Sequence, residues 1–89
     1  MIFEWDQRKA ATNRAKHGVT FEEAVSALRD PLAITGQDSS HSIGENRLIT
    51  FGTSTRARLL VVAHIEHGDR VRIISARPAT KAERRIYEE

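Results

Sequence analysis

The stretch that decides the fold reads Arg72-Ile73-Ile74-Ser75-Ala76-Arg77-Pro78-Ala79-Thr80-Lys81-Ala82-Glu83-Arg84-Arg85-Ile86-Tyr87. It begins as an apolar strand and ends as a helix, because Thr80 followed by Glu83 forms a capping box. Five cations and a tyrosine therefore surround one predicted strand-to-helix junction. Such a concentration of positive charge indicates a site for an anion, and guanidinium groups bind phosphate especially well.

The composition is that of a small globular domain. The 89 residues leave room for a single domain, spanning residues 1–89. The chain has no cysteine, so we expect it to fold by packing alone in a reducing cytosol. The first residues contain no signal-peptide segment, and no apolar run reaches membrane-spanning length. We therefore expect a cytoplasmic protein with no membrane partner.

Positive charge is concentrated in the second half of the chain. The formal net charge is +2, divided as −1 over residues 1–44 and +3 over residues 45–89. Eleven of the 14 cations are arginines, whose planar fork suits phosphate better than the point charge of lysine. This distribution indicates a polyanionic partner.

The order of the elements predicts an α+β domain. Helices are expected over residues 7–17, from Phe21 to the Asp30-Pro31 stop, and after Thr80. Strands are expected over residues 2–5, 32–35, 46–52, 59–66 and 70–76. The short connections between the later strands predict hairpins. The sequence therefore predicts a curved antiparallel sheet with two N-terminal helices and one C-terminal helix.

Three local patterns refine this prediction. Gly18 is expected to end the first helix. Thr20 and Glu23 form a further capping box, in which Thr20 caps the second helix and the Glu23 side chain bonds back. The run 59–63 is apolar at every position, which predicts a central strand covered on both faces.

Strand alternation makes a prediction about the arginines of the last strand. It places Arg70, Arg72, Ile74 and Ala76 on one face, so we expect Arg72 to be partly buried. A partly buried arginine needs an anion, either a carboxylate such as Glu45 or Glu83, or the phosphate of a ligand.

For each arginine taken alone, the simplest explanation is an ion pair with a carboxylate, and this pair would link the strand to the helix. The cluster outnumbers the acids of the neighbouring capping box, and for the cluster as a whole we favour anion binding. Its members are Arg72, Arg77, Arg84 and Arg85.

Two other side chains admit two interpretations each. His17 follows Lys16 at a predicted helix end, where cations favour the helix dipole, and its imidazole could instead transfer protons. Spacing alone favours the dipole interpretation. Tyr87 either packs on the sheet or stacks on a base.

Residues 38–47 contain Asp, His and Glu, which could suggest a metal site. Without ligand spacing or cysteine the pattern favours a solvated loop, so we expect no metal and no cofactor. His64 and His67 flank a predicted hairpin and are expected to face solvent. The sequence has no dinucleotide-binding, P-loop, zinc-protease or serine-hydrolase motif.

Short motifs over nearly the whole chain match those of one protein family in order and spacing. They are Phe3-Glu4-Trp5-Asp6, Lys9, Asn13, Lys16-His17-Gly18-Val19, Phe21-Glu22-Glu23-Ala24, Asp30-Pro31, His41-Ser42, Glu45, Arg47, Arg72-Ile73-Ile74-Ser75-Ala76-Arg77, Glu83-Arg84 and Tyr87. With these motifs the chain resembles the BrnT toxins of bacterial type II toxin–antitoxin systems. It departs from the family pattern at Pro78, where the family favours a basic residue.

The resemblance implies a RelE-like fold and a ribonuclease activity that inhibits translation. It also implies neutralisation by a BrnA-type antitoxin with a DNA-binding region. The toxin–antitoxin complex would repress its own operon, so operator DNA would be contacted only through the antitoxin.

The implied reaction is metal-independent RNA cleavage by a ribose 2′-hydroxyl, which needs a base, an acid and cations around the phosphorus. We expect Arg72 and Arg77 to stabilise the phosphate. The candidates for proton transfer are His17, Glu45 and Tyr87. The residues expected to bind the RNA backbone are Lys16, Arg47, Arg84 and Arg85. The alternative is a module that binds RNA or a protein partner through the same cations without catalysis.

Overall fold

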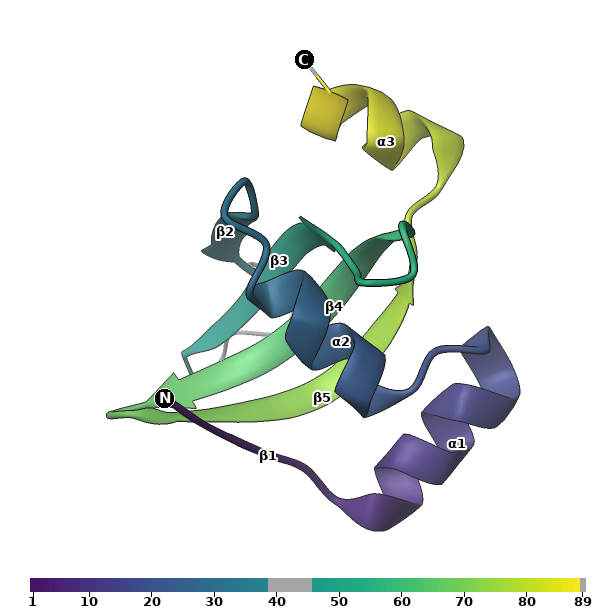
Figure 1. Cartoon of the computed structure of the whole chain (residues 1–89). Coiled ribbons are helices and arrows are strands. Elements are labelled where there is room, and N and C mark those ends of the chain that lie inside the picture. Colours follow the sequence, from purple (N-terminus) through teal and green to yellow (C-terminus); the bar gives the residue numbers. More distant parts are fainter. Residues whose placement is uncertain (39–45, 89) are drawn as a thin grey trace.

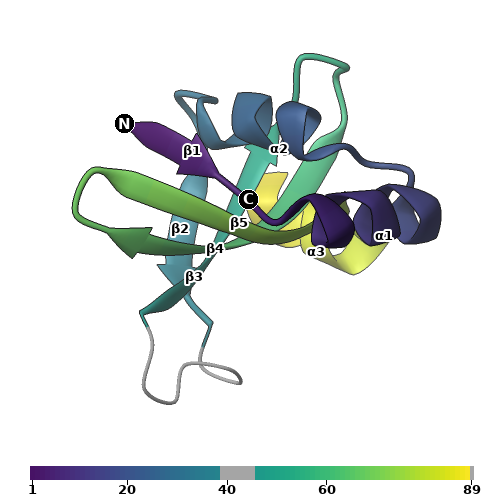
Figure 2. The same cartoon turned by 90° about the horizontal axis from the view of Figure 1, so that it is seen from below.

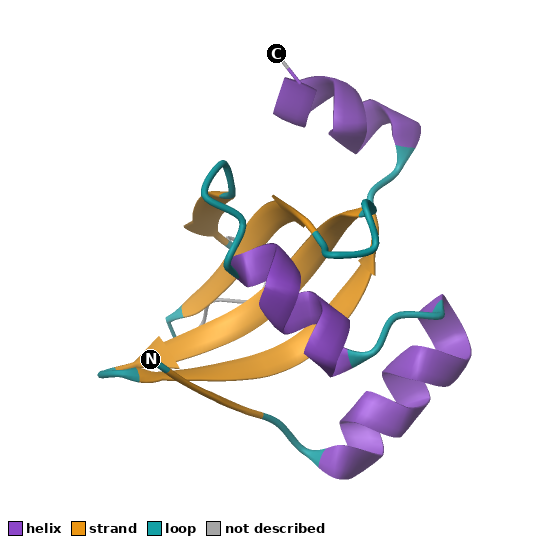
Figure 3. Ribbon diagram, in the orientation of Figure 1, coloured by secondary structure: helices purple, strands orange, loops and turns teal. Residues whose placement is uncertain are grey.

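The computed structural model describes residues 1–38 and 46–88. Eight elements follow one another along the chain (Figures 1 and 3). They are β1 (Ile2–Glu4), α1 (Gln7–His17), α2 (Phe21–Leu28), β2 (Ile34–Gln37), β3 (Arg47–Thr53), β4 (Leu59–His67), β5 (Arg70–Pro78) and α3 (Lys81–Glu88). The predicted α+β class and the number of helices are confirmed, and β2 begins two residues later than predicted. No helix in the described part of the chain is long and apolar enough to cross a membrane.

The five strands form one open sheet in the order β1-β5-β4-β3-β2. The pairs from β2 through β5 are antiparallel, whereas β1 runs parallel to β5. The sheet is therefore mixed, and the prediction of a wholly antiparallel sheet is wrong at this edge. A parallel pair requires a long connection between its strands, and the chain between β1 and β5 contains both N-terminal helices.

The core lies between α2 and one face of the sheet (Figures 1 and 2). Its fully buried side chains are Val19, Phe21, Ala24, Ala27, Leu60, Val62, Ile73 and Ala76. β4 is the middle strand, and its residues 59–64 are all buried, which confirms the predicted central position. On the face away from α2, Val61 and Ala63 are only 6% and 7% exposed. Trp5 meets the ring of Phe21 edge-on at 5.9 Å, so the segment after β1 extends the same core.

The helix ends follow the predicted signals, with one exception. Asp6 accepts hydrogen bonds from the first turn of α1, and Gly18 ends that helix with φ of 69°. Thr20 caps α2 by accepting from the Glu23 backbone N–H. The Glu23 side chain does not complete this capping box, because it binds Arg58 and Ser54 instead. A guanidinium is a stronger partner for a carboxylate than a backbone amide.

A β-bulge in β5 changes the faces that its residues occupy. Ala63 pairs with Ser75, but His64 pairs with Ile73, so Ile74 is the extra residue. Alternation restarts after it, which directs Ala76 into the core. The prediction that Arg72 and Ala76 share a face is therefore wrong, and Arg72 is exposed rather than partly buried.

The amide of Asn13 pairs with the edge of β5 beyond the reach of β1. Its nitrogen donates to the carbonyls of Ala76 and Val19, at 2.8 and 3.0 Å, and its oxygen accepts from the Ala76 backbone N–H at 3.0 Å. The side chain thus satisfies backbone groups that a further strand would otherwise pair. This contact fixes the C-terminal half of α1 against the end of β5.

His64 is buried, which contradicts the expectation that it faces solvent, whereas His67 is exposed as expected. Residues 60, 62 and 64 of β4 share the face under the helices, and this alternation places the imidazole inside. Its Nε2 lies 2.7 Å from the Thr50 hydroxyl, and its Nδ1 lies 3.5 Å from Glu66 Oε2. Burial lowers the pKa of His64, and the nearby Glu66 carboxylate opposes that shift in part.

We predict that Gly52→Ala destabilises the fold by about 1–3 kcal/mol. A Cβ at Gly52 would lie 2.1 Å from the carbonyl oxygen of Ala27, so α2 would have to move away from β3. The matched control is Gly36→Ala in β2, where a Cβ meets nothing within 4 Å. Urea unfolding of the two variants checks the prediction, and equal midpoints would contradict it.

We also predict a pH dependence of stability that originates at His64. A lowered folded-state pKa means that the unfolded chain binds the proton more readily, so stability is complete above about pH 6.5 and decreases as the pH falls below it. The slope from this one proton is at most about 1.4 kcal/mol per pH unit. Urea unfolding between pH 7.5 and 5 should show a shallower slope for His64→Gln, and an unchanged slope for the exposed control His67→Gln.

Candidate functional site

Figure 2 shows α2 over one face of the sheet. The pairing of the strands places most of their predicted site residues on the opposite face. We call it the open face and define it by three rows of cross-strand neighbours. The rows are Arg77-Val61-Phe51-Ile34, Ser75-Ala63-Ile49-Gly36 and Glu4-Arg72-Ile65-Arg47. Arg72 and Arg77 share this face although they are five residues apart, because the bulge at Ile74 shifts the alternation between them.

Arg77 is held in place by Glu83 of α3. Its Nη1 and Nη2 donate to the two carboxylate oxygens at 2.7 and 2.8 Å. Glu83 also accepts from the Thr80 backbone N–H, which completes the predicted capping box. The Arg77 hydrogen bonds are the largest cause that lowers the pKa of Glu83, to about 2. The Arg77 side chain remains 39% exposed, and its two hydrogen bonds to Glu83 hold the planar guanidinium in a fixed orientation.

α3 crosses one end of the sheet (Figure 1). It starts beside β5, and near its other end the Tyr87 hydroxyl lies 3.2 Å from Asp30 Oδ2 and 3.3 Å from the Leu32 carbonyl oxygen. Burial and the charge of Asp30 raise the pKa of Tyr87, so the phenol is a weak acid here. Arg84 and Arg85 are exposed on α3.

Arg72 and Arg47 lie at the other end of the open face and flank Ile65 in one row. Arg72 and Arg77 pair with Ile65 and Val61, four residues apart on β4, so their Cα atoms are about 13 Å apart at about 3.3 Å per residue. The two arginines therefore lie in different rows of the open face. Arg47 lies 3.4 Å from the buried Asp38 carboxylate. The predicted cluster of arginines at a single corner is thus divided between two ends of the sheet.

A cavity at this end has a volume of about 380 Å³ and is lined by Glu4, Ile65, His67, Arg70 and Arg72. Arg70 donates to Glu4 at 2.9 Å. No ion pair of Arg72 is found within the described part of the chain, so this cation faces the cavity without a carboxylate partner there.

The remaining predicted residues come from α1 and from the segment before β3. Lys16 is exposed and His17 is half-buried, both in the last turn of α1. Asn13 fixes that half of the helix beside Ala76, which precedes Arg77. The structure therefore brings Lys16 and His17 to the same end of the sheet as Arg77. Glu45 and His41 lie outside the described residues.

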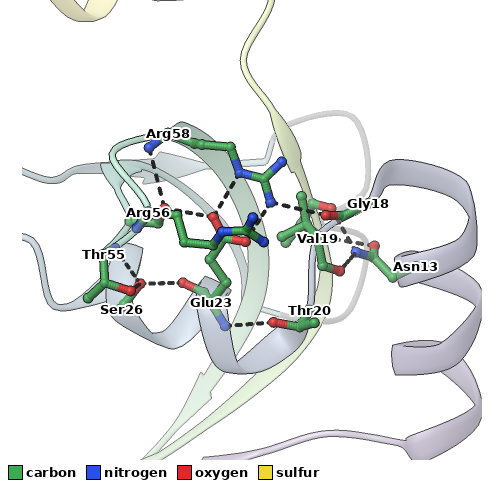
Figure 4. A network of polar contacts seen from close by, with 11 residues as sticks. Asn13, Gly18, Val19, Thr20, Glu23, Ser26, Thr55, Arg56 and Arg58 are labelled. Atoms are coloured by element: carbon green, nitrogen blue, oxygen red, sulfur yellow. Dashed lines mark hydrogen bonds and ion pairs between the residues drawn. The ribbon is translucent and has the colours of Figure 1, made fainter.

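A buried ion pair supports this end of the molecule, and the sequence analysis did not identify it (Figure 4). Glu23 is 6% exposed, and Arg58 donates to both of its carboxylate oxygens while also reaching the Gly18 carbonyl at 3.0 Å. Ser54 donates to the same carboxylate at 2.7 Å. The hydrogen bonds from Arg58 are the main reason that the pKa of Glu23 is lowered.

This network connects the β3–β4 turn to the ends of α1 and α2. The Ser54 hydroxyl accepts from the backbone N–H groups of Arg56 and Arg58, and Ala57 has a φ of 61°, a left-handed conformation that is strained for alanine. The sequence contains one unusual feature at this turn. Arg56-Ala57-Arg58 stands between two predicted strands, where a hairpin turn usually has Gly, Asn or Asp, and this could have indicated that the turn is held by side-chain contacts.

Within residues 1–38 and 46–88 no three His, Cys, Asp or Glu side chains are grouped so that they could hold a metal ion. The chemical groups that the described site offers are guanidinium, ammonium, imidazole and phenol. Such groups stabilise negative charge and transfer protons.

The fold is shared with a small ribonuclease toxin. The chain is similar to the crystal structure of the Brucella abortus ribonuclease toxin BrnT, with a TM-score of 0.71 and 25% sequence identity over 91% of this chain and 100% of that chain. A comparison with curated protein sequences finds no significant match.

The family follows from the sequence itself. Residues 5–83 match the model of the ribonuclease toxin BrnT of type II toxin–antitoxin systems. The chain belongs to the BrnT family of ribonuclease toxins, and the predicted family is confirmed. Membership implies an RNA substrate and an antitoxin partner.

We predict that Arg58→Met lowers the free energy of unfolding by about 2 kcal/mol, because it leaves the Glu23 carboxylate buried without its cation. We set this value below that of a fully buried pair because the Arg58 side chain is one-third exposed. Arg56→Met, which removes an exposed cation from the same turn, should change stability by less than about 0.5 kcal/mol.

The same comparison has a pH signature. Since the pKa of Glu23 is lowered, the pair stabilises the fold above about pH 4.5 and loses that effect as the pH falls below it. The difference between native chain and Arg58→Met in urea unfolding should therefore shrink from pH 7 to pH 3. A constant difference would show that Arg58 acts through packing alone.

Proposed function

We propose that this chain is a metal-independent endoribonuclease that inhibits translation, and that its catalytic centre lies at the end of the open face that carries Arg77. The observation that carries the proposal is the Arg77–Glu83 contact. It holds a guanidinium in one orientation at a strand end, while the Arg77 side chain as a whole remains 39% exposed. A fixed cation of this kind stabilises the charge that develops on a phosphate during cleavage.

The proposed reaction is an attack by the ribose 2′-hydroxyl on the adjacent phosphorus. The new O–P bond forms as the bond to the 5′ oxygen breaks, which leaves a 2′,3′-cyclic phosphate and a 5′-hydroxyl. One group takes the proton of the 2′-hydroxyl, and another protonates the leaving oxygen. We assign proton transfer to His17, with Glu45 and Tyr87 as the other candidates. The contact of Tyr87 with Asp30 occupies its hydroxyl and makes it the weaker candidate.

The other cations are proposed to bind the RNA backbone. Lys16, Arg84 and Arg85 are exposed near the proposed centre, whereas Arg47 and Arg72 lie at the far end of the open face. Because of this separation we assign Arg72 to a phosphate further along the RNA rather than to the scissile one. An RNA strand that crosses the open face would contact both ends.

We propose that a BrnA-type antitoxin neutralises the chain in the cytoplasm, and that operator DNA is contacted through that antitoxin. The support is membership of a type II toxin–antitoxin family, in which a toxin is paired with a protein antitoxin. A non-catalytic binding module remains the alternative, since Arg77 already has a carboxylate partner.

The experiment is cleavage of a single-stranded RNA in EDTA by the native chain and by three variants, each checked for folding by circular dichroism. We expect the native chain to release products with 2′,3′-cyclic phosphate ends. Arg77→Ala should reduce the rate about 100-fold, as removal of one donor to a developing oxyanion does. Arg72→Ala should raise KM more than it lowers kcat, because we place it away from the reacting phosphate.

Glu83→Gln is the matched control for Arg77→Ala. Glu83→Gln keeps the arginine but removes the charged partner that orients it, so it should lose activity, and less than Arg77→Ala if Arg77 acts on the phosphate directly. Equal losses in the two variants would mean that Arg77 only joins β5 to α3. A native chain that binds RNA without cleaving it, in EDTA or in a translation extract, would support the binding-module alternative.

A further inference from the structure

The row of the open face that contains Arg77 also contains an aromatic side chain. Phe51 of β3 pairs with Val61 of β4, which pairs with Arg77 of β5, so the three residues are direct cross-strand neighbours on one face. Neighbouring strands are about 4.8 Å apart, so the Cα atoms of Phe51 and Arg77, two strands apart, are separated by about 10 Å. The sequence analysis did not assign Phe51 to any site.

Phe51 belongs to the face that the core does not use. Its neighbours along β3, Thr50 and Gly52, point under the helices, where Thr50 contacts His64 and Gly52 lies against Ala27. Phe51 is half-buried, and it is not among the side chains that pack on the core cluster. Ile34, its neighbour on the edge strand β2, is 55% exposed. A ring in this position presents part of its surface to solvent.

The charges on the open face favour an anionic occupant, and the aromatic ring beside them favours RNA. Arginines stand at both ends of the face, Arg77 in the first row and Arg72 and Arg47 in the third. The side chains of Arg77 and Arg47 remain 39% and 26% exposed beside their acidic partners, and no ion pair of Arg72 is found within the described residues. A partly exposed aromatic ring on a face that also carries cations is the arrangement with which proteins bind single-stranded nucleic acid.

We propose that the ring of Phe51 stacks on a base of single-stranded RNA whose backbone phosphate lies on Arg77. The inference rests on the proposed ribonuclease function and adds to it a binding site for a base beside the reacting phosphate. Stacking requires a base that is not paired in a helix, so the chain selects unpaired RNA. Because every base has a π-face, Phe51 contributes affinity at this position and little discrimination among the four bases.

The test measures binding rather than cleavage, so that it is separate from the test of catalysis. The probe is a short fluorescent single-stranded RNA with 2′-O-methyl groups, which cannot be cleaved by 2′-hydroxyl attack. Fluorescence anisotropy gives its affinity for the native chain, Phe51→Leu, Phe51→Tyr and the control Phe3→Leu, which makes the same substitution at a partly buried ring that packs on the core. Phe51→Leu keeps an apolar side chain of similar size, and urea unfolding checks that it remains folded.

We expect Phe51→Leu to weaken binding at least fivefold, at the lower end of the range for loss of one stacked base. Phe51→Tyr should bind as the native chain does, because it retains the ring, and Phe3→Leu should bind equally well, because that ring packs on the core. A set of RNAs that each lack one base provides the decisive comparison. For one of them the native chain and Phe51→Leu should bind with equal affinity, because no base is left to stack on the ring.

The outcomes separate this inference from the proposed function. If the native chain neither binds nor cleaves RNA, both fail. If it binds and cleaves RNA but Phe51→Leu binds as tightly, only the stacking inference is overturned. If Phe51→Leu keeps its RNA affinity but no longer binds the co-expressed antitoxin, the open face is a protein interface and the inference is also overturned.

Discussion

One extra residue in β5 decides what the second half of that strand can do. Before the bulge, Val71 and Ile73 point into the core and Arg70 and Arg72 point away from it. Strict alternation would then place Arg77 in the core under α2. Burying its charge there would be strongly unfavourable without an acidic partner. The bulge at Ile74 restarts the alternation, so that Ala76 packs in the core and Arg77 reaches the open face.

The end of the sheet near Arg77 is stabilised by polar contacts rather than by a larger core. Asn13 pairs with the backbone of Ala76, Arg58 pairs with the buried Glu23, and Glu83 pairs with Arg77. Each contact joins elements that are far apart in the sequence or starts a helix. In a chain of this size the core is modest, and such contacts fix side chains in positions that hydrophobic packing alone leaves variable.

The local signals of the sequence were sufficient for the elements and for the family. Asp6, Gly18, Thr20 and the Thr80–Glu83 box place the helix ends correctly, because caps depend on residues only a few positions apart. The errors concern contacts between distant residues. Burial of His64 depends on Thr50 of the neighbouring strand, and the partner of Glu23 is Arg58, 35 residues away.

The sequence by itself determined the α+β class, the limits of most helices and strands, the BrnT family and the excess of arginine. These properties depend on local pattern and composition, which can be read directly from a single sequence. The tertiary structure alone decided the parallel pairing of β1, the face on which each arginine lies, and the division of the arginines between two ends of the sheet. Those properties depend on strand register and on one bulge, and a shift of a single residue reverses the face of every side chain that follows.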